Sequence, residues 1–84
     1  MQAKIYITLK EGVLDPQGKA IEKALGQLGF GGIKGVQQGK LIEIDLEAAS
    51  EDAARQHLTD MCEKLLANVV IEDYRIDIDT DAVE

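Results

Sequence analysis

Residues 3–9, Ala-Lys-Ile-Tyr-Ile-Thr-Leu, carry the clearest structural signal in this chain. Apolar side chains occupy every second position, at Ile5, Ile7 and Leu9, with Lys4, Tyr6 and Thr8 between them. Successive side chains of a strand point to opposite faces of a sheet, so the alternation predicts a half-buried β-strand. The neighbouring segments must therefore supply the strands that pair with it and the helices that cover its apolar face.

A helix is predicted next, over residues 16–28. Asp15 can cap it by accepting hydrogen bonds from backbone N–H groups, and Pro16 has no N–H to leave unpaired in the first turn. Gly29 can end it in the left-handed conformation. An apolar stripe at helical spacing supports the assignment; its residues are Ala20, Ile21, Ala24, Leu25 and Leu28.

The middle of the chain allows two geometries. A glycine-rich segment, residues 30–39, leads into residues 41–46, where Ile42, Ile44 and Leu46 share one parity. One geometry is a long strand bent at Gly39; the other is a hairpin that turns through residues 37–40. The alternation does not choose between them, because the apolar residues face the same side in both.

A second helix is predicted after Ser50, whose side chain can cap it. Asn68 is expected to end it, because asparagine tolerates the left-handed region. Residues 69–78 then predict a last strand, and residues 79–84 are expected to fray. The apolar stripe of this helix comprises Ala54, Leu58, Met61, Cys62, Leu65 and Leu66.

Together these elements predict one α+β domain over residues 1–84, in the order β-α-β(β)-α-β. The sheet would be small and antiparallel, with three strands (the middle one long and bent) or four with a hairpin, and both helices would lie on one face. The opposite face would carry Tyr6, Leu41, Val69 and Ile71 among acidic residues. A small domain with a partly apolar, uncovered face is a candidate for association.

Composition excludes several classes of function. The formal net charge of −7 over 84 residues disfavours nucleic acid and anionic membranes as partners, since phosphate groups attract basic surfaces. Cys62 is the single cysteine, so no internal disulfide can form. The chain contains no apolar run that could span a bilayer and no signal peptide, and we therefore expect a cytoplasmic protein.

Candidate catalytic, cofactor-binding and metal-binding residues are also lacking. Residues 29–35 are glycine-rich but follow a helix rather than a strand, which is the wrong context for a phosphate loop. His57 has no nucleophile or orienting acid at a suitable spacing, and Cys62 is expected to be buried and inert. The acidic residues near the C-terminus lack the pattern of a calcium loop. We therefore expect a protein that acts by binding other proteins.

Two stretches resemble the PurS family. Residues 13–18 read Val-Leu-Asp-Pro-Gln-Gly, and residues 61–68 read Met-Cys-Glu-Lys-Leu-Leu-Ala-Asn, continued by Val-Ile-Glu-Asp-Tyr-Arg at residues 70–75. The middle motif of the family usually reads Val-Arg-x-Gly-Lys. Here residues 36–40 read Val-Gln-Gln-Gly-Lys, so Gln37 replaces the arginine.

The resemblance implies a non-catalytic subunit of phosphoribosylformylglycinamidine synthase, an ATP-dependent glutamine amidotransferase complex of de novo purine biosynthesis. In this family the small subunit holds the glutaminase PurQ and the large synthetase PurL together and assists the transfer of ammonia. It is usually a dimer and possibly a tetramer. ATP and magnesium are used by the large subunit, and no cofactor is expected on this chain.

Eight residues are candidate subunit contacts on this basis: Asp15, Pro16, Gly18, Gly39, Lys40, Glu72, Asp73 and Tyr74. Gly18 lies in a first helical turn, where glycine costs about 0.5–1 kcal/mol relative to alanine, which suggests close approach by another chain. An alternative class is a dimeric small-molecule-sensing or protein-interaction module. Direct binding of nucleotides or amino acids to the isolated chain would favour that alternative.

Overall fold

The computed structural model describes residues 1–79. Their order is β-α-β-α-β, as predicted, and the expected fraying at the C-terminus concerns residues that fall almost entirely outside this range. The elements are β1 (Gln2–Leu9), α1 (Pro16–Gln27), β2 (Gly39–Asp45), α2 (Glu51–Met61), the π-helical turn η1 (Cys62–Leu66) and β3 (Glu72–Asp79).

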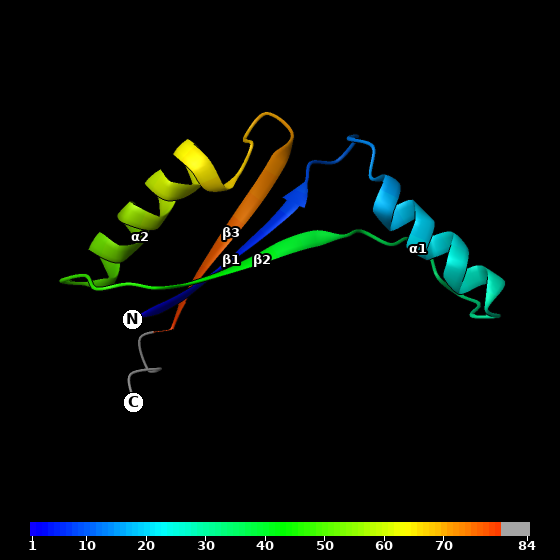
Figure 1. Cartoon of the computed structure of the whole chain (residues 1–84), viewed down its shortest axis with the longest axis horizontal. Helices are drawn as coiled ribbons and strands as arrows, with labels where there is room; N and C mark the ends of the chain where they lie inside the picture. Colours follow the sequence, from blue (N-terminus) through cyan, green and yellow to red (C-terminus); the bar gives the residue numbers. More distant parts are fainter. Residues whose placement is uncertain (80–84) are drawn as a thin grey trace.

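The three strands form one antiparallel sheet in the order β2-β1-β3. The alternating stretch identified first in the sequence is thus the central strand. Its Ile5 lies opposite Ile42 on β2 and Ile76 on β3. All three side chains therefore point to the same face, which is the face that α2 covers (Figure 1).

The hairpin alternative for the middle of the chain is wrong. A single strand forms, as in the other alternative, but it begins at Gly39 and is neither long nor bent there. Gly39 begins β2 opposite Thr8, and residues 30–38 run from the end of α1 back to the sheet without forming a strand (Figure 1). A Cβ atom at Gly39 would lie only 2.6 Å from the carbonyl oxygen of Ile7. The glycine therefore permits β2 to approach β1 at this point.

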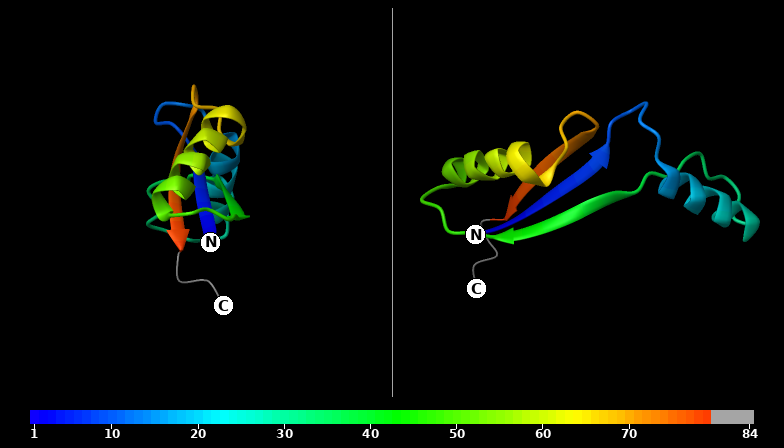
Figure 2. Two further views of the ribbon diagram at one scale, coloured as in Figure 1. Left: turned by 90° about the vertical axis from the view of Figure 1, so that its left-hand side faces the viewer. Right: turned by 45° about the horizontal axis from the view of Figure 1, so that its top comes forward.

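The core lies between the sheet and the α2–η1 helix (Figure 2). A helix about 10 Å across covers the central strand of a sheet with strands about 4.8 Å apart, and leaves the outer strands half covered. Accordingly Ile42 and Ile44 on β2, and Ile76 and Ile78 on β3, are only partly buried. The buried cluster itself comprises Ala3, Ile5, Ile7, Leu58, Cys62 and Ala67.

The prediction that both helices lie on one face of the sheet is wrong for α1, which extends beyond the end of the sheet (Figure 1). The Cα radius of gyration is 16.3 Å, against about 12 Å for a compact domain of this length. The cause is a tertiary contact, because Asp15 bonds both the first turn of α1 and the backbone at Gln38, 23 residues further along the chain. These bonds hold the helix in line with β2. We call α1 and residues 28–38 the arm, and the sheet with α2 and η1 the body.

The end of the second helix also differs from prediction. The N–H of Ala67 donates to the carbonyl of Cys62, five residues earlier, at 3.0 Å. This wider turn moves Ala67 into the core and leaves Leu65, predicted to be buried, 82% exposed. Asn68 does not adopt the left-handed conformation, since within residues 1–79 only glycines have positive φ. The helix ends because Ala67 is extended, with φ −125° and ψ 144°.

The last strand starts later than predicted because residues 68–71 form a turn. The N–H groups of Ile71 and Glu72 both donate to the carbonyl of Asn68, at 3.0 and 2.7 Å. Val69 and Ile71 therefore do not lie on the outer face of the sheet, where the sequence pattern had put them.

Candidate functional site

The candidate contact residues gather at one end of the sheet, where the arm joins the body. A hollow of about 360 Å³ opens there, with Ile7 and Leu9 from β1 among its lining residues. Much of the remaining lining comes from Asp15, Pro16, Gly39 and Lys40. The sequence separated these residues into two motifs, and the tertiary structure brings them together.

Asp15 ties the arm to the strand that returns from it. Its Oδ1 accepts a hydrogen bond from the N–H of Gly18 at 2.9 Å, and its Oδ2 accepts one from the N–H of Gln38 at 3.0 Å. These two backbone donors stabilise the carboxylate and hold the pKa of Asp15 below its ordinary value. The predicted helix cap is confirmed, and the same side chain also fixes residues 23 positions away.

Gly18 is buried because the backbone approaches it closely. A Cβ atom at this position would lie 2.6 Å from the carbonyl oxygen of Val36. The sequence suggested close approach by another chain, but the neighbour is the returning segment of the same arm. Gly18 thus lets α1 pack closely on that segment. This packing within one chain explains why a glycine is present in the helix despite its lower helix stability.

Gln37, which stands where arginine is usual in the family, makes a defined contact. Its Nε2 donates a hydrogen bond to the carbonyl oxygen of Leu9 at 3.0 Å, joining the arm to the end of β1. A neutral amide thus links arm and body here.

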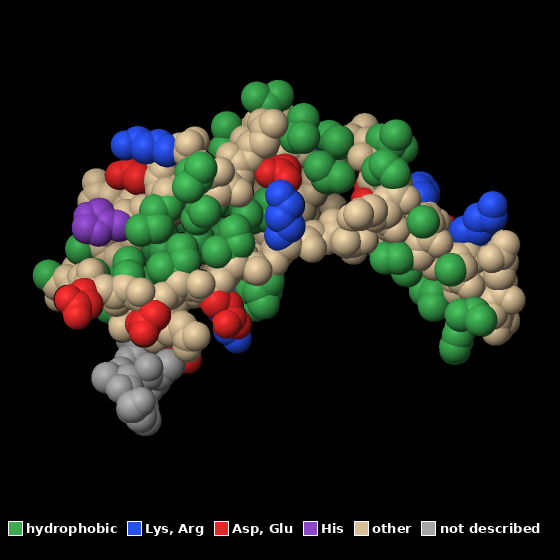
Figure 3. All heavy atoms as spheres, viewed as in Figure 1, with side chains coloured by type: hydrophobic (Ala, Val, Ile, Leu, Met, Phe, Trp, Pro, Cys, Tyr) green, Lys and Arg blue, Asp and Glu red, His purple; other side chains and the backbone are tan. Residues whose placement is uncertain are grey.

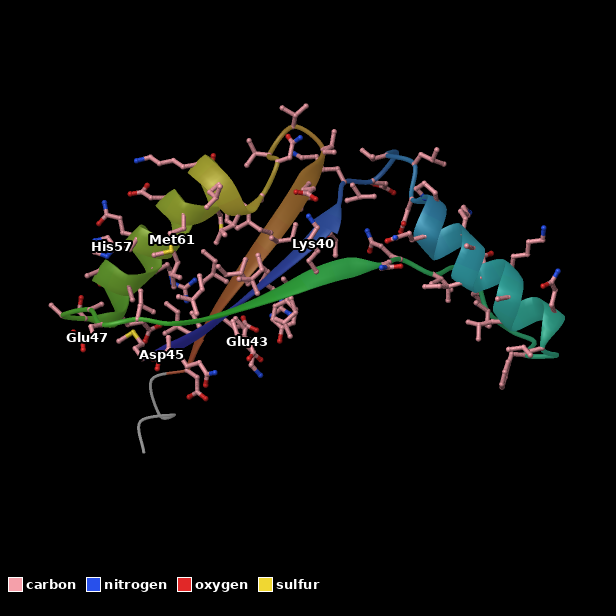
Figure 4. All side chains as sticks on the ribbon, viewed as in Figure 1. Lys40, Glu43, Asp45, Glu47, His57 and Met61 are labelled. Atoms are coloured by element: carbon pink, nitrogen blue, oxygen red, sulfur yellow. The ribbon has the colours of Figure 1, made fainter. Side chains whose placement is uncertain are left out.

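Lys40 and Glu72 connect the two outer strands across β1. The Nζ of Lys40 lies 3.5 Å from Oε2 of Glu72, whose side chain is only 12% exposed. The other carboxylate oxygen of Glu72 accepts a hydrogen bond from the N–H of Asn68 at 2.7 Å. Asp73 forms a more exposed ion pair with Lys10, at 3.5 Å. Figure 4 shows Lys40 close to the point where β2 meets the arm.

Tyr74 joins β3 to the end of the second helix. Its hydroxyl donates to Oε2 of Glu63 at 2.7 Å. This bond to a carboxylate favours the protonated phenol and is the main reason that the pKa of Tyr74 rises to about 12. Glu72, Asp73 and Tyr74 therefore all have partners within the chain.

Sequence reasoning missed several strongly exposed apolar side chains. On the arm, Leu28 is 73% exposed and Phe30 is 60% exposed. On η1 and the turn that follows it, Leu65 is 82% exposed and Val70 is 80% exposed. The run Val-Val-Ile at residues 69–71, directly after an asparagine, was a usable signal for an apolar turn. Leu65 gave no such signal, because its exposure depends on the π-helical turn.

Two further reactive side chains lie on the second helix and its end. Cys62 is buried in the core, as predicted, and burial raises the pKa of its thiol, with Glu63 adding to the effect. His57 is exposed on α2 (Figure 4). Within residues 1–79 no three histidine, cysteine or acidic side chains are grouped so that they could hold a metal ion. No helix in that range has the length and apolar character needed to cross a membrane.

These features define a class: a small α+β association domain, in which a packed body carries an arm with exposed apolar side chains. Comparison with known proteins narrows this to one family. The family profile of PurS, described as phosphoribosylformylglycinamidine (FGAM) synthase, matches residues 2–80. The chain belongs to the PurS family.

Individual relatives agree over most of their length. Phosphoribosylformylglycinamidine synthase subunit PurS of Archaeoglobus fulgidus is 53% identical over 76 residues, which cover 90% of this chain and 95% of that protein. The crystal structure of Methanocaldococcus jannaschii PurS, one of the subunits of formylglycinamide ribonucleotide amidotransferase, matches with a TM-score of 0.85 and 45% identity, covering 93% of this chain and 94% of the other.

The third relative comes from a complex. A chain in the structure of PurLQS from Thermotoga maritima matches with a TM-score of 0.79 and 31% identity. The match covers 92% of this chain and 96% of that one. In that organism the fold therefore occurs in the PurLQS complex.

Proposed function

We propose that this chain is a subunit of a phosphoribosylformylglycinamidine synthase complex in purine biosynthesis, where it joins a glutaminase subunit of the PurQ type to a synthetase subunit of the PurL type. It takes no chemical step itself. ATP and magnesium act on the large subunit, and the complex works in the cytoplasm, where a lone thiol such as Cys62 stays reduced.

The observation that carries this proposal is the match to a chain in the PurLQS complex over 92% of the chain. The site supports it in a second way. The candidate residues that carry charge are engaged within the chain, as the Asp15 and Lys40–Glu72 contacts illustrate. The surface exposed to solvent is partly apolar, and such a surface suits a protein that binds other subunits.

A bridging subunit also has a physical reason to exist. Ammonia in water at neutral pH is mostly protonated and then is not a nucleophile, so its delivery between two active sites needs a path shielded from bulk solvent. A domain without catalytic groups can contribute that shielding by holding the two larger subunits in fixed positions.

The arm supports self-association of this subunit. Only Gly18 is buried in α1, and hydrophobic side chains lie along the lower side of the arm in Figure 3. Between Gly31 and Gln37, no backbone N–H of the described chain donates to another backbone carbonyl. Exposed apolar side chains beside a segment without backbone hydrogen bonds are suited to pack against a second copy of the chain. The partly buried side chains of β2 offer an apolar surface on which the arm of such a copy could pack.

The activity test compares two nitrogen sources. The large and glutaminase subunits are mixed with and without this chain, and amidine formation is measured. We expect glutamine-dependent formation to require the chain and ammonia-dependent formation to require it far less. Equal glutamine-dependent rates with and without the chain would contradict the proposed function.

The self-association test uses sedimentation of the isolated chain. Leu28→Asp puts a charge on the apolar side of the arm and should shift the chain to a monomer. Gln27→Asp makes the same change in charge at the neighbouring exposed position and should leave the oligomer intact. Identical sedimentation of the two variants would refute an apolar contact through the arm.

A further inference from the structure

The arm lacks the packing that usually stabilises a helix. α1 is 12 residues long, and Gly18 is its only buried residue. It also contains a second glycine, Gly26, and each glycine lowers the helix propensity. Isolated helices shorter than about 12–15 residues are marginal in water, and most helices in proteins depend on the packing of an apolar face. The contacts at the root of the arm must therefore supply much of the order of α1.

Asp15 provides the contact that joins the two ends of the arm. Its Oδ1 caps α1 through the N–H of Gly18 at 2.9 Å, and its Oδ2 accepts from the N–H of Gln38 at 3.0 Å. Hydrogen bonds to a carboxylate are stronger than those between neutral groups. Gln38 directly precedes β2, so these bonds fix the start of α1 relative to the sheet. The arm consequently projects beyond the sheet in one direction (Figure 1).

Charge indicates that this arm meets a second copy of the chain. Residues 16–38 contain three lysines and one acidic residue, whereas the whole chain has a net charge of −7. A basic arm is attracted to the acidic body of another copy, since complementary charges favour association. On β2, the exposed Glu43 and Asp45 alternate with the partly buried Ile42 and Ile44. That strand therefore offers such an arm both apolar and acidic groups.

The order of the arm affects how tightly it can bind. A segment that becomes ordered only on contact loses conformational entropy, and a segment that is already ordered avoids this cost. We infer that Asp15 is a positioning residue for self-association, which orders the arm for a second copy without contacting that copy. This inference rests on the proposed function, in which the arm packs against a second copy. It differs from the expectation that Asp15 is itself a subunit contact.

The test separates the two hydrogen bonds of Asp15. In Asp15→Asn the amide oxygen can still cap α1, because asparagine caps helices as well as aspartate does. The amide NH2 group, however, cannot accept the bond from Gln38. The matched control, Glu11→Gln, makes the same change in charge at an exposed residue of the turn before α1.

Three measurements on the full chain are needed. Sedimentation over a range of concentrations gives the dissociation constant for self-association. Amide hydrogen exchange of the dilute, monomeric chain reports the order of α1. A urea transition followed by tyrosine fluorescence reports the folding of the body, because Tyr6 lies on β1 and Tyr74 on β3.

We expect Asp15→Asn to raise the dissociation constant at least about tenfold, as for the loss of one hydrogen bond to a charged group. In the monomer its α1 amides should exchange faster than those of wild type, while the urea midpoint of the body stays the same. The control should match wild type in all three measurements. At high protein concentration the variant should form species of the wild-type size, because its docking surfaces are unchanged.

Four results would overturn the inference. An unchanged dissociation constant would show that the Gln38 bond does not matter for association. Weaker association with unchanged exchange in α1 would make Asp15 a direct contact. A lower urea midpoint would assign Asp15 to the folding of the body, and an equal loss in the control would leave charge alone as the cause. A wild-type chain that is monomeric at every concentration would overturn the proposed self-association, and this inference with it.

Discussion

The body and the arm of this small chain differ in how their apolar side chains are buried. In the body, Ile5, Leu58 and Cys62 are fully buried between the sheet and one helix. In α1 the only buried residue is Gly18, and Leu28 remains 73% exposed. The body can therefore be stabilised by its own hydrophobic core, whereas the arm is held mainly by a few polar contacts at its root.

The difference shows how one short sequence serves both folding and assembly. Apolar residues that pack within the chain stabilise the body, and apolar residues left on the arm and in the turn before β3 remain available for association. A domain of this size buries only about 60% of the surface of its unfolded chain, so exposed apolar groups are costly unless another chain covers them.

The largest expected effect comes from the core of the body. Leu58→Ala should lower the free energy of unfolding by about 2–5 kcal/mol, because it leaves a cavity at a fully buried position. Leu28→Ala on the arm should change it by less than about 0.5 kcal/mol when the chain is monomeric. Urea unfolding at low protein concentration measures both; similar losses would mean that the arm packs as the body does.

A second test concerns two glycines of α1. Gly18→Ala would drive a Cβ atom to 2.6 Å from a backbone oxygen, and should destabilise the arm by about 1–3 kcal/mol. Gly26→Ala meets no atom within 4 Å and should stabilise the helix by about 0.5–1 kcal/mol. Amide hydrogen exchange along α1 reports both changes. Opposite signs support the close packing at Gly18, and equal signs would contradict it.

Tyr74 tests a contact within the body. Tyr74→Phe removes the bond to Glu63 and should cost about 0.5–1 kcal/mol. The folded-state pKa of about 12 lies above the ordinary value of 10.0. The stabilisation is therefore complete below pH 10 and is lost as the pH rises through about 12. The phenolate absorbance that Tyr74→Phe removes from the wild-type signal should titrate near pH 12; if this difference titrated near pH 10 instead, the contact would be contradicted.

The smallest effect is expected at the root of the arm. The pKa of Asp15 is held below 3.8, so its contribution is present above that pH and is lost as the pH falls through the folded-state value. In wild type the amide resonances of Gly18 and Gln38 should titrate with a midpoint below 3.8. Asp15→Asn should abolish this titration, and Asp60→Asn, on the exposed side of α2, should not. A midpoint at or above the ordinary value would contradict the two hydrogen bonds.

Local patterns in the sequence were enough to find the central strand and the starts of both helices. Alternation of apolar residues identified the central strand, and the caps at Asp15 and Ser50 placed the starts of both helices. These features depend on residues close together in the chain, where spacing and hydrogen-bonding capacity are visible in one dimension. The two family motifs likewise sufficed to identify PurS.

Tertiary contacts decided the rest. The position of α1 depends on a bond between Asp15 and a residue on the far side of the glycine-rich segment, and the exposure of Leu65 depends on which side chain fits beneath the helix end. Neither has a periodic signature, because each results from competition between distant segments for the same space. The sequence alone therefore determined the elements and the family, and the packing determined which apolar side chains are left exposed for other subunits.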